Sequence, residues 1–359
     1  MKKSIIALAM LSAGITQASA QSNVTIYGIV DAGVTYVSNE SGNRTSVEAG
    51  QMQVSRWGFK GVEDLGGGVK ARFGLEGTLL NDTGGAGVGT GTPSSTSLFD
   101  REATVGLITD FGSIDIGRQN ILGVQSVGMA DPMGLAFAAT SPNVLFSAMN
   151  NSAVYGPFGS NNGGTALREN NSVRYVSPNF RGLGFAVMRG FGEQPGDIQK
   201  NSYMGVSTFY TGGALSVGGA YARLKNNLGN DRLTSHAFGI KYTFPVVVLK
   251  STYSENRLDS TTRKIKVFGV GADFLVAPAV TLTAAYYNTK RSGDANDKSQ
   301  QLIGIAKYAF SKRTSAYVSI GRATTDTIVT ATQINLAQGF VAIGSDKANR
   351  ATTGVIHYF

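Results

Sequence analysis

The residues of this sequence most able to do chemistry are charged side chains gathered on one face of an extended segment. In residues 69–79 every odd position is apolar or glycine, whereas the even positions include Lys70, Arg72 and Glu76. Successive side chains of a strand point to opposite sides, so all three charges share one face. Charge held between low-dielectric walls attracts counter-ions, and arginine keeps its charge at any working pH. We therefore expect electrostatic handling of anions.

Further basic residues surround this segment. Arg56 and Lys60 share a parity, opposite two aromatic residues. In the long segment 119–169, Asp131 is the only carboxylate between Arg118 and Glu169. A connection of about fifty residues without its own structure is normally functional, and inside a barrel it would narrow the lumen. For each arginine near this segment taken alone, the alternative interpretation is an ordinary solvated loop residue. Four arginines flank this segment: Arg101, Arg118, Arg168 and Arg174.

Bond-making chemistry has little support in the sequence. The chain has two histidines, His236 and His357, and neither stands with a serine or paired carboxylates in a hydrolase arrangement. It has no cysteine, which with two separated histidines makes a zinc site implausible. The glycine-rich run 84–91 lacks the Gly-Lys-Ser/Thr ending of a phosphate-binding loop. We expect no catalytic residue, no metal and no cofactor.

Residues 1–20 have the pattern of a cleaved secretory signal. Lys2 and Lys3 precede a short apolar core, and residues 18–20 read Ala-Ser-Ala, a typical cleavage site. A membrane anchor is the alternative, but the apolar core is too short for one. The sequence therefore predicts a signal peptide followed by one domain, residues 21–359.

The charge balance is basic, with a formal net charge of +9. Basic residues are a common signature of nucleic-acid binding. Here they are spread along the chain without Lys/Arg blocks, and the predicted signal takes the protein out of the cytoplasm. We expect no nucleic-acid partner, and we interpret the positive charge as the lining of a pore.

Alternating segments of about ten residues recur along the whole chain. Ten tilted strand residues rise roughly 23 Å, about the height of the apolar band of an outer membrane. The mean hydropathy of −0.02 is what a barrel gives when lipid-facing and water-facing positions average out. Tight turns alternate with longer polar connections. The strand candidates are 24–37, 51–62, 69–79, 99–109, 113–118, 170–177, 183–192, 202–210, 214–222, 235–243, 247–254, 264–275, 280–289, 300–310, 315–323 and 351–359.

These sixteen segments predict an all-β fold, a 16-stranded antiparallel transmembrane β-barrel with short periplasmic turns and long external loops. The long connections are expected at 80–98, 119–169, 223–234, 255–263, 290–298 and 324–349. In a bilayer every sheet edge must be paired, so the last strand, ending at Phe359, should pair with the first. In 264–275, Lys264 and Lys266 share the parity of apolar positions, so this strand should enter the membrane only after Val267.

The chain resembles the general porins of the Gram-negative outer membrane, in their β-proteobacterial, neisserial-like branch. The resemblance covers the whole chain after the signal. It rests on VTIYGIVD at 24–31, SRWGFKGVEDLG at 55–66, REATVGL at 101–107, FG at 111–112, GRQ at 117–119, NNSVRY at 170–175, SPNF at 177–180, SKRT at 311–314 and the HYF ending.

The resemblance implies a homotrimer in outer-membrane lipid, with the third external loop folded into the lumen as a constriction. It implies that basic residues facing this loop carry anion selectivity, and by motif position these match Arg56, Arg101 and Arg168. Glu76 matches an acidic position on the wall, and Asp131 is the candidate acid of the inward loop.

We therefore expect an outer-membrane channel for passive diffusion of small hydrophilic solutes and inorganic anions. Two alternatives keep the same barrel. It could act as a receptor or adhesin through its loops, or as a substrate-specific channel, which should show an aromatic ladder or a continuous arginine track. A barrel enzyme, such as a phospholipase or protease, is disfavoured by the two isolated histidines.

Overall fold

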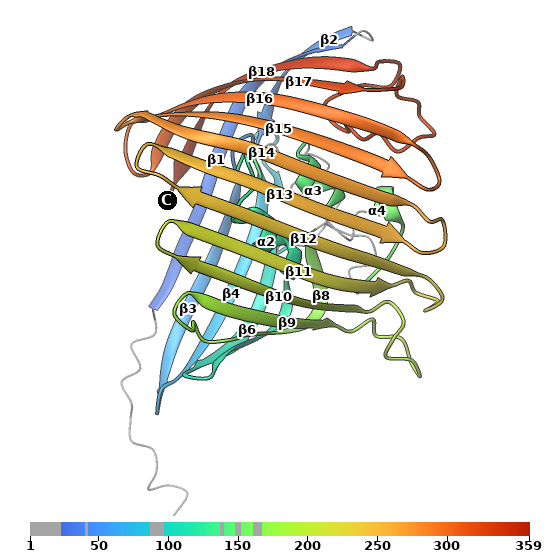
Figure 1. Cartoon of the computed structure of the whole chain (residues 1–359). Coiled ribbons are helices and arrows are strands. Elements are labelled where there is room, and N and C mark those ends of the chain that lie inside the picture. The colour runs from blue at the N-terminus through green and yellow to red at the C-terminus, as the bar shows by residue number, and fades with distance from the viewer. Residues whose placement is uncertain (1–22, 40–41, 87–96, 137–139, 148–151, 161–166) are drawn as a thin grey trace, which may run out of the picture.

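The structure is a computed structural model that describes residues 23–39, 42–86, 97–136, 140–147, 152–160 and 167–359. Its strands form one antiparallel sheet that closes on itself as a barrel (Figure 1). The predicted signal, residues 1–20, lies outside the described residues. Within the described ranges, no helix combines the length and the apolar character needed to cross a membrane.

Sixteen strands of the described chain make the barrel wall, as predicted. β2 and β3 both pair with β1 and together act as one interrupted strand, whereas β5 forms only a small hairpin with the end of β4. The strands are β1 Asn23–Asn39, β2 Gly42–Ala49, β3 Arg56–Gly66, β4 Val69–Leu80, β5 Gly85–Ala86, β6 Glu102–Thr109, β7 Gly112–Asn120, β8 Arg168–Val176, β9 Leu183–Gly190, β10 Tyr203–Gly212, β11 Leu215–Lys225, β12 Arg232–Thr243, β13 Val247–Leu258, β14 Lys264–Ala277, β15 Val280–Ser292, β16 Asp297–Ala309, β17 Thr314–Thr325 and β18 Lys347–Tyr358.

The barrel closes where the first strand meets the last. The second half of β1 pairs with β18 in antiparallel register. The pairing continues to the final residue, because Gly28 N donates to Phe359 O at 3.2 Å and Phe359 N donates to Gly28 O at 3.1 Å. A Cβ at position 28 would collide with the Phe359 ring, so glycine is needed for this contact. The predicted pairing of the first and last strands is confirmed.

The two faces of the wall differ as the alternation predicts. On β1, Val24, Ile26 and Val34 are exposed on the outer face, at 61%, 63% and 49%. Asp31 and Thr35 point inward and are fully buried. The outer face is therefore apolar and suited to lipid, whereas the inner face is polar.

Short turns gather at one end of the barrel, which we call the short-turn rim, and longer connections gather at the other, the loop rim (Figure 1). Aromatic pairs stand near the short-turn rim: Tyr242 with Phe244, at 4.6 Å between ring centroids, and Tyr308 with Phe310, at 5.2 Å. Such aromatic girdles mark the level where lipid meets water in membrane barrels.

At the loop rim several strands are longer than predicted. The long connections expected at 223–234, 255–263 and 290–298 are wrong, because β11 to β16 extend through them and leave turns at 226–231, 259–263 and 293–296. These extensions stand beyond the apolar band. There the outer face carries polar residues such as Arg223 and Lys290, whereas Leu224, Leu233 and Leu258 are buried on the inner face, so the alternation is inverted. β2 is mostly polar and exposed, so it lacks the alternation that predicts a strand.

The third external connection, residues 121–167, is hereafter called loop 3. It holds helices α2 Leu122–Gly128, α3 Pro142–Phe146 and α4 Ser152–Tyr155. Helix α2 packs on the inner side of β10, β11 and β12. Gly218 and Gly239 face each other beneath it, and a Cβ at Gly239 would collide with the Ser126 carbonyl. Loop 3 thus lies inside the barrel, as predicted (Figure 1).

We predict that deleting Phe359 lowers the yield of folded barrel. The deletion removes two hydrogen bonds that close the sheet and uncovers backbone groups that lipid cannot satisfy. The yield is measured as the fraction of protein that migrates as a folded, heat-sensitive species on a gel after refolding. Phe359→Leu keeps the backbone pair and serves as the control. Equal yields of the deletion and wild type would show that closure does not depend on this residue.

Candidate functional site

One carboxylate on the inner wall is shared by two arginines. Glu76 projects inward from β4, and its Oε1 accepts a hydrogen bond from Arg101 Nε at 2.6 Å. Arg56, at the start of β3, places its Nε 3.8 Å from the other oxygen, Oε2. Tyr27 OH also donates to this oxygen, at 3.1 Å. Two guanidinium groups thus compete for one negative charge, and the cluster keeps a net positive charge.

Two further arginines pack behind this cluster. Arg168 is 6% exposed, and its Nε donates to the carbonyl oxygen of Arg101 at 2.9 Å. Arg118 donates from Nε to the carbonyl of Asp100 at 2.6 Å and from Nη1 to Asn170 Oδ1 at 2.5 Å. The Asp100 carboxylate accepts from the backbone and hydroxyl of Thr78. The predicted grouping of Arg56, Arg101, Arg118, Arg168 and Glu76 is present as one connected set.

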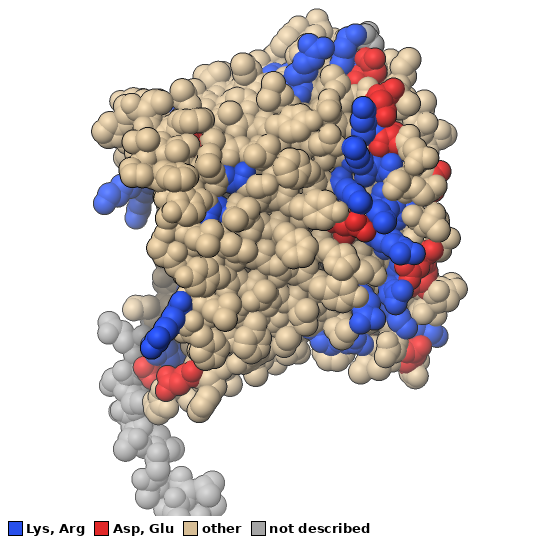
Figure 2. All heavy atoms as spheres, in the orientation of Figure 1, with Lys and Arg blue, Asp and Glu red and all other residues tan. Residues whose placement is uncertain are grey.

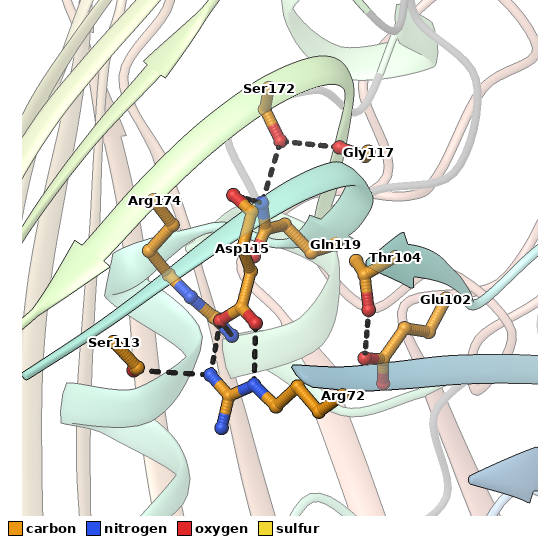
Figure 3. Close-up of polar contacts among 9 residues, drawn as sticks. All are labelled: Arg72, Glu102, Thr104, Ser113, Asp115, Gly117, Gln119, Ser172 and Arg174. Carbon is orange, nitrogen blue, oxygen red and sulfur yellow. Dashed lines mark hydrogen bonds and ion pairs between the residues drawn. The ribbon is translucent and has the colours of Figure 1, made fainter. Parts of the chain in front are cut away.

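A second shared carboxylate lies further along the same wall (Figure 3). Asp115 of β7 accepts two parallel hydrogen bonds from Arg72, at 2.6 and 2.5 Å, and its Oδ2 also lies 3.2 Å from Arg174 Nη2. The two-pronged contact fixes Arg72 in a single orientation. Nearby, the Glu102 carboxylate accepts from Thr104 at 2.8 Å. Arg174, which only flanked the long connection in the sequence, thus joins the wall.

The two predicted lysines of this wall differ in position. The Lys60 ammonium lies 4.9 Å from the centre of the Tyr27 ring, next to the Glu76 cluster. Lys70 is exposed and lies opposite Asp64, close to the short-turn rim. Lys60 therefore belongs to the cluster, whereas Lys70 lies at the mouth of the barrel.

Residues 50–55 turn into the lumen, although the sequence predicts a strand that begins at residue 51. Asp31 holds them, since its Oδ2 accepts from the backbone N–H of Met52 at 2.5 Å and of Gln53 at 2.7 Å. Its Oδ1 accepts from Tyr317 OH at 2.7 Å. The role of Asp31 depends on β17, which is almost three hundred residues away.

The inward segment meets loop 3. Gln53 Nε2 donates to the carbonyl of Gly134 at 3.2 Å, and Arg56 Nη2 donates to Gln53 Oε1 at 3.3 Å. Loop 3 therefore reaches across the lumen to the wall that carries the arginines. The contact that links the loop to this wall is made by Gln53, which the sequence did not single out.

Asp131 fixes the other side of loop 3. It is 1% exposed, and its carboxylate accepts from Asn143 Nδ2 at 2.6 Å and from Tyr287 OH at 3.1 Å. The backbone N–H groups of Met133 and Leu135 donate to it at 3.1 and 2.8 Å. Burial raises the pKa of this carboxyl, although its hydrogen bonds act in the opposite direction. Asp131 thus ties loop 3 to β15 and is not exposed toward the arginines.

Two cavities occupy the lumen near the short-turn rim. One, of about 490 Å³, is lined by Lys250, Lys307 and Lys312, with Asp273 as its acid. The other, of about 400 Å³, is lined by three basic residues, Lys60, Arg72 and Arg174, and by two acids, Glu102 and Asp115. Basic side chains outnumber acidic ones in both cavities. The arrangement can attract and pass anions, and the lumen groups in it act by charge.

The two histidines lie on the outer face, away from this wall. His236 packs against Tyr221 with 5.1 Å between ring centroids, and His357 Nδ1 lies 2.9 Å from Thr314 Oγ1. Neither contacts a serine hydroxyl or a carboxylate in the described part of the chain.

Comparison with known proteins gives a consistent result. A family profile described as Gram-negative porin matches residues 5–328. Outer membrane porin protein 32 of Delftia acidovorans is 31% identical over 99% of this chain and 98% of its own length. The major outer membrane protein P.IB of Neisseria meningitidis serogroup B is 29% identical over 89% of this chain and 93% of its own.

Two solved structures share the fold. The anion-selective porin from Comamonas acidovorans superimposes with a TM-score of 0.79 at 25% identity, covering 94% of this chain and all of the other. OmpT of Vibrio cholerae, in a trimer form, gives a TM-score of 0.66 at 17% identity, with 94% and 99% covered.

We predict that Tyr287→Phe loosens loop 3 without unfolding the barrel. It removes a donor to the buried Asp131 carboxylate, a loss of about 2 kcal/mol for a hydrogen bond to a charged group. Amide hydrogen exchange at residues 131–135 should become at least tenfold faster. Tyr286→Phe is the control, since Tyr286 lies on the outer parity of the same strand. Unchanged amide hydrogen exchange in Tyr287→Phe would show that the hydrogen bond from Tyr287 to Asp131 does not anchor loop 3.

Proposed function

Because this chain belongs to the Gram-negative porin family, we propose that its outer-membrane channel prefers anions and that the arginines beside loop 3 set this preference. The protein is an outer-membrane porin, a channel and not an enzyme. It passes small hydrophilic solutes by passive diffusion. The proposal concerns the sign of the charge that the channel favours and the residues responsible for it.

The main support for this proposal is the ratio of arginines to carboxylates in two clusters on the inner wall. Arg56 and Arg101 share Glu76, and Arg72 and Arg174 share Asp115. Each group of three ionised side chains therefore has a net charge of about +1. A guanidinium paired with a carboxylate of its own would add little to the electric field in the lumen. Two arginines that share one carboxylate leave one positive charge uncompensated.

Position makes this charge effective. Gln53 links Arg56 to Gly134 of loop 3, so the first group lies where the loop narrows the lumen. Charges in a narrow passage with low-dielectric walls raise the local concentration of the opposite ion. Because arginine does not lose its proton in the working range, the preference for anions should be constant through neutral pH.

We also propose that the barrel assembles as a homotrimer. Its support is the resemblance to the porin family, together with the trimer form of the Vibrio cholerae relative. The apolar outer face allows either lipid or a second copy to cover it. Three channels in one particle should open together when a single particle enters a bilayer.

We predict that Arg56→Glu combined with Arg101→Glu lowers or reverses the preference for chloride over potassium. The change turns the Glu76 group from about +1 to about −3, so cations are attracted at the narrowing. The reversal potential in a planar bilayer under a potassium chloride gradient measures the ratio. The control is Arg223→Glu with Arg257→Glu, on the outer face, which changes the net charge by the same amount. Its reversal potential should stay near that of wild type.

An unchanged reversal potential in the variant with Arg56→Glu and Arg101→Glu would show that these two arginines do not set the ion selectivity. A shift of equal size in the outer-face variant would instead point to the net charge of the protein.

The oligomeric state has its own measurement. Sedimentation equilibrium in density-matched detergent should give three times the mass of one chain. A mass of one chain under the same conditions would contradict the trimer while leaving the channel proposal in place.

A further inference from the structure

Between its two rims, the barrel keeps its charged side chains on the inner wall. In Figure 2 the charges of the outer face gather toward the rims, and the broad wall between them is largely uncharged on the side shown. In the lumen cavity of about 400 Å³, Asp115 pairs with Arg72 and Arg174. Three groups that line this cavity are incompletely used: the Glu102 carboxylate, the Lys60 ammonium and Nη1 of Arg72. We call these three groups the mixed-charge site.

Glu102 is a lumen carboxylate without a cationic partner. Among the described residues, the only hydrogen bond to its carboxylate comes from Thr104 Oγ1, at 2.8 Å, and it takes part in no ion pair. The carboxylate lies over Gly74 of the adjacent strand β4, where a Cβ would stand 2.6 Å from Glu102 Oε1. Glycine at position 74 therefore provides the space that Glu102 occupies. One neutral donor orients the carboxylate and leaves most of its acceptor positions available to a solute.

Two donors on the same wall also have unused capacity. The Lys60 ammonium lies 4.9 Å from the centre of the Tyr27 ring and forms no ion pair within the described part of the chain. Arg72 uses Nε and Nη2 for its hydrogen bonds to Asp115 and Ser113, whereas Nη1 points away from Asp115 (Figure 3). Because a guanidinium donates through all of its N–H groups, this edge of Arg72 can still bind an oxygen anion.

The strand register places the three groups close enough for one small molecule to reach them. Lys60 is the cross-strand neighbour of Gly74, the residue over which the Glu102 carboxylate lies. Neighbouring strands are about 4.8 Å apart, and Arg72 stands two residues, roughly 7 Å, from Gly74 on the same face. A molecule with an ammonium group and a carboxylate on one carbon spans up to roughly 9 Å when each end makes a hydrogen bond of about 2.8 Å. The spacing of the site therefore matches such a molecule.

The signs of the charges select among solutes. The three basic residues and two acids that line the cavity sum to a net charge of about +1. A simple anion would meet Lys60 and Arg72 but be repelled by Glu102. A simple cation would meet one available carboxylate on a wall that is basic overall. A molecule that carries both charges satisfies all three groups at once.

We propose that the mixed-charge site binds zwitterionic α-amino acids as they cross the channel, with the ammonium on Glu102 and the carboxylate on Lys60 and Arg72 Nη1. The inference rests on the proposed function, because a solute reaches this wall only through an open lumen. A cavity of about 400 Å³ also has room for an aliphatic side chain. Binding should be weak, because a solute that is conducted must leave the site again.

The test titrates leucine against the ion current of the full-length channel in a planar bilayer. Leucine has no net charge at neutral pH, so it does not change the ionic strength, and its occupation of the lumen lowers the current. Two analogues keep its side chain: isocaproate lacks the ammonium, and isoamylamine lacks the carboxylate. Glu102→Gln removes the charge at nearly constant shape. Glu63→Gln removes the same charge at an exposed position near the short-turn rim and is the matched control.

The half-blocking concentration of leucine should rise about tenfold in Glu102→Gln, which is the size of a lost hydrogen bond between charged groups. In Glu63→Gln it should stay within twofold of wild type. Isocaproate should respond in the opposite direction and block Glu102→Gln at a lower concentration than wild type, because its repulsion by the carboxylate is removed. In the wild-type channel leucine should block at a lower concentration than either analogue.

Three results would each overturn the proposal: unchanged block by leucine in Glu102→Gln, an equal loss in Glu63→Gln, or shifts of leucine and isocaproate in the same direction. The reversal potential of the same channels, recorded before leucine is added, tests the proposed anion preference separately. A potential of the sign set by chloride together with unchanged block by leucine would contradict the mixed-charge site alone.

Discussion

The constraint that organises this protein is the absence of water in the membrane interior. A backbone N–H or C=O that faces hydrocarbon without a partner costs several kcal/mol, so a sheet in the bilayer can have no free edge. The chain meets this requirement where β1 pairs with β18 and where Gly28 exchanges two hydrogen bonds with Phe359. Closing the sheet creates an outer face for lipid and an inner face that must hold polar groups. The remaining features of the structure follow from this division.

Polar groups inside the barrel satisfy one another in ways that also position the channel. Asp31 holds the inward segment 50–55, and Asp131 holds loop 3 against β15. These two anchors stand on different parts of the wall, and Gln53 and Gly134 meet between them. The carboxylates that could have neutralised the lumen are thus used to hold its shape. On the wall, Arg56 and Arg101 share Glu76, and Arg72 and Arg174 share Asp115.

Much of the fold could be predicted from the sequence because a two-residue period reports directly on which face meets lipid. Residues 69–79 have the faces that their alternation predicts, and short connections join β8 to β9 and β16 to β17 near the predicted strand ends. Beyond the apolar band the outer face of a strand meets water instead of lipid, and the inner face of β11, β12 and β13 buries Leu224, Leu233 and Leu258. The apolar-outward period is then lost, which is why β2 and the outer ends of β11 to β16 could not be recognised.

The candidate site was predictable to a similar extent. The resemblance to the porin family, by motif position, was enough to group Arg56, Arg101 and Arg168 with Glu76. The roles of Gln53, Asp31 and Asp131 depend on partners far away in sequence. No local pattern could tell an acid that faces the channel from one that is buried in an anchor.

We propose that this barrel is an open channel whose narrowing favours anions. Single-channel recording in a planar bilayer, with a tenfold potassium chloride gradient, tests both parts at once. We expect stepwise conductance and a reversal potential of the sign set by chloride, unchanged between about pH 6 and pH 9, where arginine does not titrate. A reversal potential of the sign set by potassium would contradict it, and so would the absence of any conductance from a folded barrel.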